Sequence, residues 1–187
     1  MEHFYHNING WSHDINQGKL LETIIPLINN QNLNIAEIGV YNGRLTALWC
    51  TKLINLNIIF NYYAIDKRDN FENILNENIK PIINNVNIIN DFSINAANKF
   101  PDNFFDIVYI DANHNYDSVS EDIKTWYPKV KSNGCICGDD FNQNYPGLMK
   151  AVFDFFEPNI TKIGLIIGYN KSFNTSDNYP QWWHIKK

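Results

Sequence analysis

The 187-residue chain contains little cysteine, which limits the covalent and metal chemistry to expect. Its three cysteines are Cys50, Cys135 and Cys137, and an odd number without a secretion signal argues against a disulfide framework. Cys135 and Cys137 lie two positions apart in an apolar run, with no further soft ligand nearby. We therefore expect buried, reduced thiols rather than a metal site.

The chain also lacks a run of basic residues, a long apolar segment and a signal peptide. Its 15 lysines and arginines are scattered among 20 acidic residues, which predicts neither nucleic acid nor a membrane as a partner. No apolar run approaches the roughly 18–20 residues that span a bilayer. The N-terminus has neither the basic nor the apolar region of a leader. We expect a cytoplasmic protein.

Strand and helix patterns alternate along the chain, which has enough apolar residues (44%) for one core. We expect strands at 34–40, 57–66, 85–91, 103–111, 134–141, 161–170 and 180–187. We expect helices at 16–30, 44–53, 70–79, 93–100, 117–128 and 146–157. The alternation predicts a single α/β domain over residues 1–187, with a Rossmann-like, doubly wound sheet of seven strands. The sheet should be mostly parallel, with an antiparallel hairpin at its C-terminal edge, joined by a polar loop at 171–179.

The segment "AEIGVYNGRLTALWC" begins like a buried strand, breaks at Gly39 and Gly43, and continues like a helix. Such a turn usually holds a cofactor at the carboxyl end of the sheet. A dinucleotide site needs a glycine where Tyr41 stands, so the turn fits a ligand without a pyrophosphate. Asp66, at the end of the next strand, is placed to accept the hydroxyls of a ribose. The start of the following helix, around Arg44 to Thr46, offers free N–H groups to a small carboxylate. S-adenosylmethionine combines a ribose with a carboxylate and has no pyrophosphate; the alternatives are a packing turn and a solvated Asp66.

Several motifs resemble the class I S-adenosylmethionine-dependent methyltransferases, and in particular the small branch that includes sugar and macrolide O-methyltransferases. The motifs are "EIGVYNGRLT", "YAIDKRD", "INDFS" and "FDIVYIDANHNYDSVSEDIKTWYPKVKSNGCICGDDF", of which the last matches best. The third departs from the family at Asn90 and Phe92, and Ala112 and Asn133 replace family glycines. The resemblance covers the chain from about Trp11 onward.

The resemblance implies which residues hold the cofactor and which segment covers it. The cofactor-binding residues would be Trp11, Glu37, Gly39, Tyr41, Gly43, Asp66, Asp91 and Asp111. Residues 1–32 would form an N-terminal arm and a helix that cap the cofactor site.

Three acids follow two strands that we expect to be neighbours. Carboxylates as close as Asp111, Asp139 and Asp140 would raise one another's pKa values, and a hard cation such as Mg²⁺ would relieve the repulsion. The cation could orient an acceptor hydroxyl and lower its pKa. The alternative is that Asp139 or Asp140 caps the following turn. We therefore predict Asp111, Asp139 and Asp140 as metal ligands.

His114 lies three residues beyond Asp111 and is predicted, with Asp111, to be catalytic. A neutral imidazole there could take the proton of the hydroxyl that receives the methyl group. The alternative is a histidine that hydrogen-bonds backbone in a turn.

The sequence thus predicts methyl transfer to an oxygen of a small molecule or sugar. One alternative is a nucleotide-dependent oxidoreductase on a similar fold, and Tyr41 argues against it. The other is a non-catalytic cofactor-binding subunit. Because the chain has little inserted material to build an acceptor pocket, a homo-oligomer or another partner is an alternative source of that pocket.

Overall fold

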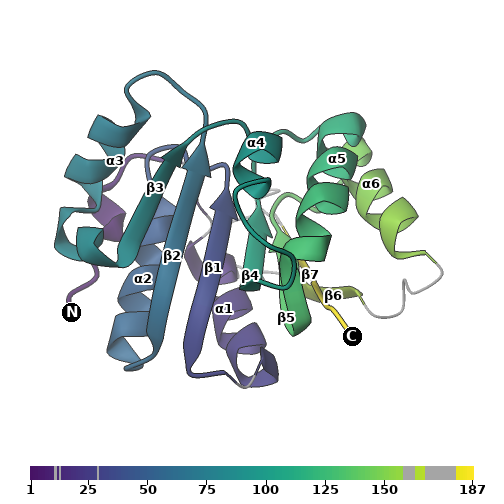
Figure 1. The fold of residues 1–187 in the computed structure, drawn as a ribbon. Coiled ribbons are helices and arrows are strands. Elements are labelled where there is room, and N and C mark those ends of the chain that lie inside the picture. Colours follow the sequence, from purple (N-terminus) through teal and green to yellow (C-terminus); the bar gives the residue numbers. More distant parts are fainter. Residues whose placement is uncertain (11, 13, 29, 158–162, 167–179) are drawn as a thin grey trace, which may run out of the picture.

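The computed structural model describes residues 1–10, 12, 14–28, 30–157, 163–166 and 180–187. Seven strands form one sheet (Figure 1): β1 (Asn32–Ile38), β2 (Ile59–Asp66), β3 (Val86–Asn90), β4 (Phe105–Ile110), β5 (Val130–Gly138), β6 (Ile163–Ile166) and β7 (Gln181–Ile185). The helices are α1 (Asp14–Ile28), α2 (Arg44–Asn55), α3 (Phe71–Asn78), α4 (Ser93–Ala97), α5 (Tyr116–Trp126) and α6 (Pro146–Phe156). The elements follow the predicted order.

The strand order is β3-β2-β1-β4-β5-β7-β6, with β1 to β5 parallel. β7 pairs antiparallel with both β5 and β6, so it lies between them. This confirms the predicted seven-stranded, mostly parallel sheet and its antiparallel C-terminal strands. The order reverses between β1 and β4, which is where ligands bind in sheets of this kind. The predicted loop at 171–179 and the outer parts of the strand predicted at 161–170 lie outside the described residues.

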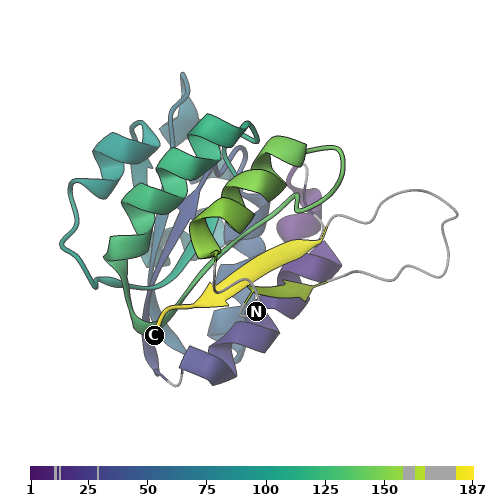
Figure 2. The ribbon, with the colours of Figure 1, turned by 90° about the vertical axis from the view of Figure 1, so that its right-hand side faces the viewer.

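Two apolar clusters cover the two faces of the sheet. Helices α1, α2 and α3 pack on one face, against side chains such as Ile35 and Ile107. Helices α4, α5 and α6 pack on the other, against side chains such as Ile38 and Val108. Residues of one strand alternate between the clusters because successive side chains of a strand point to opposite faces. Figure 2, seen from the C-terminal edge, shows α1 on one side of β7 and α5 and α6 on the other.

Local signals explain several element boundaries. β1 ends at Ile38, two residues earlier than predicted, because Gly39 adopts a φ of +88° and turns the chain. The Asn115 side chain accepts a hydrogen bond from the Ser118 amide at 2.9 Å and caps α5. β5 begins at Val130, four residues earlier than predicted, because Val130 already pairs with Phe105.

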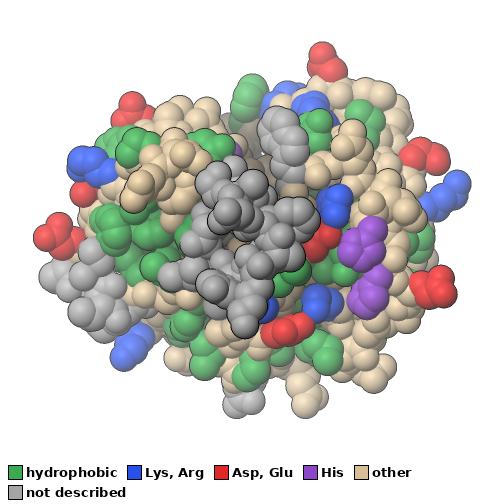
Figure 3. All heavy atoms as spheres, turned by 180° about the vertical axis from the view of Figure 1, so that it is seen from behind, with side chains coloured by type: hydrophobic (Ala, Val, Ile, Leu, Met, Phe, Trp, Pro, Cys, Tyr) green, Lys and Arg blue, Asp and Glu red, His purple; other side chains and the backbone are tan. Residues whose placement is uncertain are grey.

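The exterior has mixed charge. On the face in Figure 3, acidic and basic side chains of the described residues are interspersed. Among the described residues, no helix is both long and apolar enough to cross a membrane.

Candidate functional site

A cavity of about 1250 Å³ opens at the carboxyl ends of β1 to β5. Most of the residues that the sequence assigns to the site line it, because parallel strands end at the same edge of the sheet. The lining residues among them are Glu37, Gly39, Tyr41, Asp66, Asp91, Asp111, His114, Asp139 and Asp140. Trp11 lies outside the described residues.

The turn after β1 is tied to the end of β2. One carboxylate oxygen of Asp66, Oδ2, accepts hydrogen bonds from the backbone amides of Val40 (3.0 Å) and Tyr41 (2.7 Å). No described residue donates to its other oxygen, Oδ1, which can therefore accept a hydrogen bond from a ligand. Tyr41 has a φ of +52°, an uncommon conformation for a residue with a side chain, and the Arg68 guanidinium lies 4.9 Å from the centre of its ring. Asp66 thus both shapes the turn and presents an acceptor to the cavity.

The two glycines of the turn have different roles. A Cβ on Gly39 would lie 2.1 Å from the Asp111 carbonyl oxygen, so Gly39 lets the turns after β1 and β4 approach each other. A Cβ on Gly43 would lie 2.3 Å from Leu75 of α3, and Gly43 is not among the residues that line the cavity. Gly43, which the resemblance places at the cofactor, is therefore required here for its φ of +85° and for helix packing.

Glu37 is a buried acid in β1. Its Oε2 accepts hydrogen bonds from the Thr46 hydroxyl (2.6 Å) and the Tyr62 hydroxyl (2.8 Å). Burial raises the pKa of Glu37 to about 8, although these two hydrogen bonds oppose the rise. Glu37 is therefore mostly uncharged at neutral pH.

The far end of the cavity lies between the turn after β3 and helix α5. Asp91 accepts a hydrogen bond from the Phe92 amide at 2.8 Å and forms an ion pair with Lys99 at 2.7 Å, and Lys99 lowers the pKa of Asp91. The Ser93 hydroxyl donates to Asp122 of α5, and burial raises the pKa of Asp122 to about 6. This end thus offers the ligand polar groups from two elements.

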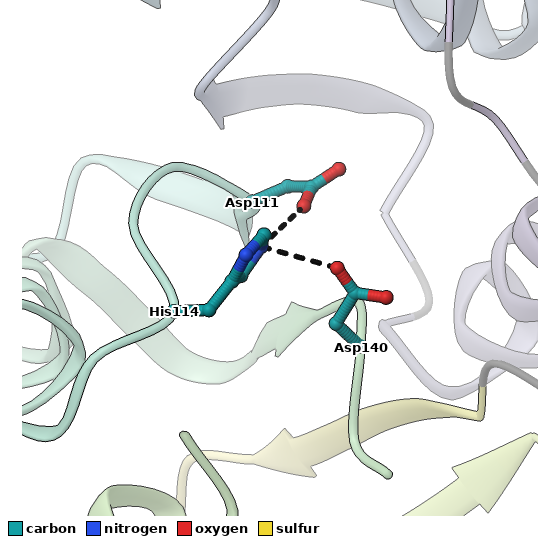
Figure 4. Close-up of side chains that lie close together, drawn as sticks. All are labelled: Asp111, His114 and Asp140. Atoms are coloured by element: carbon teal, nitrogen blue, oxygen red, sulfur yellow. Dashed lines mark hydrogen bonds and ion pairs between the residues drawn. The ribbon is translucent and has the colours of Figure 1, made fainter. Parts of the chain in front are cut away.

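Asp111, His114 and Asp140 form a compact cluster between the ends of β4 and β5 (Figure 4). His114 Nε2 lies 3.4 Å from Asp111 Oδ1 and 3.1 Å from Asp140 Oδ2. The ring centre of His114 lies 4.5 Å from that of Tyr145, which also lines the cavity. All three side chains of the cluster are partly exposed, so a ligand in the cavity can reach them.

The protonation of this cluster follows from its geometry. The hydrogen bond to Asp111 raises the pKa of His114, and the charge of Asp140 raises it further. Burial raises the pKa of Asp111, and the charges of Asp139 and Asp140 add to the rise. Two carboxylates thus share one imidazole, and the cluster can hold an extra proton near neutral pH.

Asp139 is oriented away from this cluster. Its carboxylate accepts hydrogen bonds from Gln17 of α1 (2.9 Å), Gln181 of β7 and the backbone amide of Asp140 (2.7 Å). The predicted metal set of Asp111, Asp139 and Asp140 therefore differs from the group that the structure brings together, in which His114 replaces Asp139. The reason is that neighbouring residues at a strand end point in different directions.

The start of the chain contacts the glycine turn. Arg44, the first residue of α2, forms a two-point ion pair with Asp14 of α1 (3.0 and 2.6 Å). The side-chain amide of Asn42 donates a hydrogen bond to the Asn9 backbone carbonyl oxygen at 2.8 Å. Gly10 and Ser12 line the cavity. The arm therefore lies beside the cavity, and its capping role remains a prediction.

Sequence reasoning missed several polar residues at the cavity or directly beneath it: Gln17, Ser93, Asp122, Tyr145 and Gln181. Ser93 and Asp122 lie within two of the quoted motifs, but neither was assigned to the site, and Gln17, Tyr145 and Gln181 lie outside every quoted motif. Asp122 in a helix could have been found only from its burial, since an aspartate is rarely buried without a partner.

A family model described as "Methyltransferase domain" matches residues 36–141, more than half of the 187-residue chain. No curated protein sequence matches the chain significantly.

Solved structures share the fold at low sequence identity. An O-methyltransferase from Bacillus cereus in complex with SAH superposes with a TM-score of 0.68 at 14% identity, over 97% of this chain and 86% of that one. A precorrin 8w decarboxylase from Methanobacterium thermoautotrophicum gives a TM-score of 0.66 at 14% identity, over 96% and 94% of the two chains. Spermidine synthase from Thermotoga maritima gives 0.63 at 13% identity, over 91% of this chain and 59% of that one. The chain belongs to the methyltransferase-domain family that its sequence matches, and its fold is that of the class I S-adenosylmethionine-dependent methyltransferases.

Proposed function

We propose that the protein transfers the methyl group of S-adenosylmethionine to a hydroxyl oxygen of a small molecule or sugar. The observation that supports the proposal is one cavity lined both by Asp66 and by the Asp111, His114 and Asp140 cluster. In the proposal, Asp66 accepts a hydrogen bond from a ribose hydroxyl and the cluster takes the proton of the acceptor. The family supports a methyltransferase, and the neighbour with SAH bound supports the cofactor. The O-methyltransferase activity is named for that neighbour and is inferred for this chain.

The proposed cofactor position follows the polar groups along the cavity. Oδ1 of Asp66 would accept a hydrogen bond from a ribose hydroxyl, and the backbone turn at Gly39 would lie beneath the sulfonium. The adenine would reach the end formed by Asp91 and Ser93. This order leaves the Asp111, His114 and Asp140 cluster beside the methyl group.

The chain's own residues would align the reactants and remove a proton. The acceptor oxygen forms a bond with the methyl carbon as the carbon–sulfur bond breaks, and the electron pair of that bond stays on sulfur as S-adenosylhomocysteine leaves. The proton of the acceptor hydroxyl passes to the Asp111–His114 pair, whose raised pKa values suit it to hold that proton. The Tyr145 ring beside His114 would exclude water from this position.

The donor set fits a divalent cation in part. Asp111 and Asp140 offer the carboxylate oxygens that Mg²⁺ prefers, whereas the imidazole of His114 is not a usual Mg²⁺ ligand. Asp111 and Asp140 would therefore hold the ion. When bound, it would supply a Lewis acid that lowers the pKa of the acceptor hydroxyl.

Methyl transfer itself tests the proposal. The protein is incubated with S-adenosylmethionine carrying a labelled methyl group and with a panel of catechols, monosaccharides and nucleotide-activated sugars. We expect label in at least one hydroxyl-bearing product, together with S-adenosylhomocysteine. Label found only on nitrogen would contradict O-methylation but would still show that the protein is a methyltransferase.

Substituting Asp66 with asparagine should weaken cofactor binding. The amide keeps the size of the side chain but removes the negative charge. That charge strengthens the hydrogen bonds that the carboxylate accepts from two backbone amides and would accept from a ribose hydroxyl. We expect the Kd for S-adenosylhomocysteine to rise at least about tenfold, measured by calorimetry. Asp69→Asn, an exposed neighbour, makes the same charge change and should bind like the wild type. Equal affinities of the two variants would remove Asp66 from the cofactor site.

Removing divalent ions tests the metal role. After dialysis against EDTA, we expect turnover to fall at least about tenfold and to recover when Mg²⁺ is added, because the ion would stabilise the developing alkoxide. Dialysis without EDTA is the control. Undiminished turnover would refute the metal and leave the Asp111–His114 pair as the base.

A further inference from the structure

A buried polar network lies beneath the turn formed by Asp139 and Asp140. Its amides are Gln17 of α1, whose residue is 1% exposed, and Gln181 of β7, which is fully buried. Gln17 Nε2 donates to Asp139 Oδ2 at 2.9 Å, and Gln181 Nε2 donates to Asp139 Oδ1. Two elements far apart in the sequence therefore hold the two oxygens of one carboxylate.

Tyr109 and Ser12 fix the orientation of these amides. The Tyr109 hydroxyl accepts from Gln17 Nε2 at 3.2 Å, and its single proton has two acceptors within reach, Gln181 Oε1 at 2.8 Å and Asp139 Oδ2 at 3.2 Å. The Ser12 hydroxyl donates to Gln17 Oε1 at 2.5 Å. The Ser12 hydroxyl also lies 2.8 Å from Asp14 Oδ1, so these two acceptors share its one proton. Because the ionised Asp139 carboxylate can only accept, the Gln17 amide presents its Nε2 to it.

The network connects to the reacting cluster through the backbone. Asp139 Oδ1 accepts the amide of Asp140 at 2.7 Å, and Asp140 has a φ of +57°. A residue with a side chain persists in that conformation only where its surroundings impose it. The Asp140 carboxylate in turn lies 3.1 Å from His114 Nε2. A shift of the Asp139 carboxylate would therefore move Asp140 relative to His114.

We propose that Gln17 and Gln181 are positioning residues that act through Asp139 to hold the Asp140 carboxylate against His114. The inference rests on the proposed function for its catalytic consequence, but the structural link can be tested without an acceptor. Besides packing on the sheet, α1 would then help to position the reacting cluster. Ser12, which precedes α1 and lines the cavity, would be connected to His114 through Gln17, Asp139 and Asp140.

The test replaces each amide with a side chain of similar length that cannot donate. Gln17→Met and Gln181→Met are compared with Ile24→Val, which removes one methyl group from the buried face of the same helix α1. Three quantities are measured: the ring resonances of His114 in histidine-labelled protein by NMR, the Kd for S-adenosylhomocysteine, and kcat with the acceptor found in the panel. A purely structural role would not separate these quantities.

We expect both glutamine variants to shift the His114 resonances and to lower kcat about tenfold to a hundredfold, with the Kd within about twofold of wild type. Ile24→Val should change neither resonance nor kcat. In an Asp139→Asn background, Gln17→Met should add little to either effect, since its partner carboxylate is already gone.

Wild-type His114 resonances or wild-type kcat in the glutamine variants would overturn the proposal. If Gln17→Met does not fold, Gln181→Met decides, because it removes a donor to the same carboxylate from the β7 side. A wild-type protein that binds no S-adenosylhomocysteine would refute methyl transfer instead, and a His114 shift in the variants would then still establish the structural link.

Discussion

Replacing His114 with alanine is expected to lower kcat by about 10²- to 10⁴-fold, the usual contribution of a positioned general base. The variant removes the imidazole whose Nε2 lies 3.4 Å from Asp111 and 3.1 Å from Asp140. It leaves two carboxylates close together without the imidazole between them, so a weaker base must take the proton of the acceptor hydroxyl. The measurement is single-turnover transfer of the labelled methyl group with the acceptor from the panel.

Cofactor binding separates catalysis from folding in this experiment. Because the proposed function places His114 beside the methyl acceptor and away from the adenosine, the Kd for S-adenosylhomocysteine should stay within about twofold of wild type. His3→Ala, which removes an exposed imidazole near the N-terminus, is the matched control and should keep full turnover. Normal turnover of His114→Ala would exclude the imidazole as the base.

Glu37 should make the stability of the protein fall as the pH rises. Its pKa is raised from 4.5 to about 8 by burial, whereas in the unfolded chain it returns to the ordinary value. Between these values the folded state holds a proton that the unfolded state has released, so the free energy of unfolding decreases with increasing pH. The stabilisation is fully present below pH 4.5 and is lost as the pH passes through about 8. Its size is at most about 5 kcal/mol, from a rise of about 3.5 in pKa.

The Glu37→Gln variant isolates this effect. The amide oxygen can still accept from the Thr46 and Tyr62 hydroxyls, but it has no proton to lose. From urea unfolding curves, we expect the free energy of unfolding to decline less in the variant than in the wild type between pH 5 and pH 8. The decline that remains comes from Asp111 and Asp122, whose pKa values burial also raises. Glu72→Gln, at an exposed position in α3, should decline like the wild type. Parallel pH profiles for Glu37→Gln and wild type would show that Glu37 is ionised in the folded protein.

The sequence predicts much of the fold because its signals are local. Apolar runs ending in Asp66 and Asp111 indicate parallel strands, and parallel strands bring their carboxyl ends to one edge. The acids after the strands could therefore be assigned to one site before their distances were known. Gly39 was recognisable for the same reason, since the turn after the first strand is local.

The features that the sequence does not predict depend on the direction in which a side chain points and on contacts between residues that are far apart in the sequence. Asp139 and Asp140 are adjacent in sequence, yet Asp139 faces Gln17 in the buried polar network, whereas Asp140 faces His114 in the cavity. Gln17 reaches Asp139 from 122 positions away, and no local pattern predicts that contact. Gly43 has the spacing of a cofactor glycine, but its close neighbour is Leu75 of α3.

The central claim is that the cavity at the carboxyl ends of β1 to β5 binds the adenosyl cofactor. Isothermal titration of the purified protein with S-adenosylhomocysteine tests it most directly, with NAD as the comparison ligand. We predict saturable heat with one S-adenosylhomocysteine bound per chain and no heat with NAD, since Tyr41 occupies the position where a pyrophosphate would approach the backbone. Heat with NAD alone, or with neither ligand, would contradict the account.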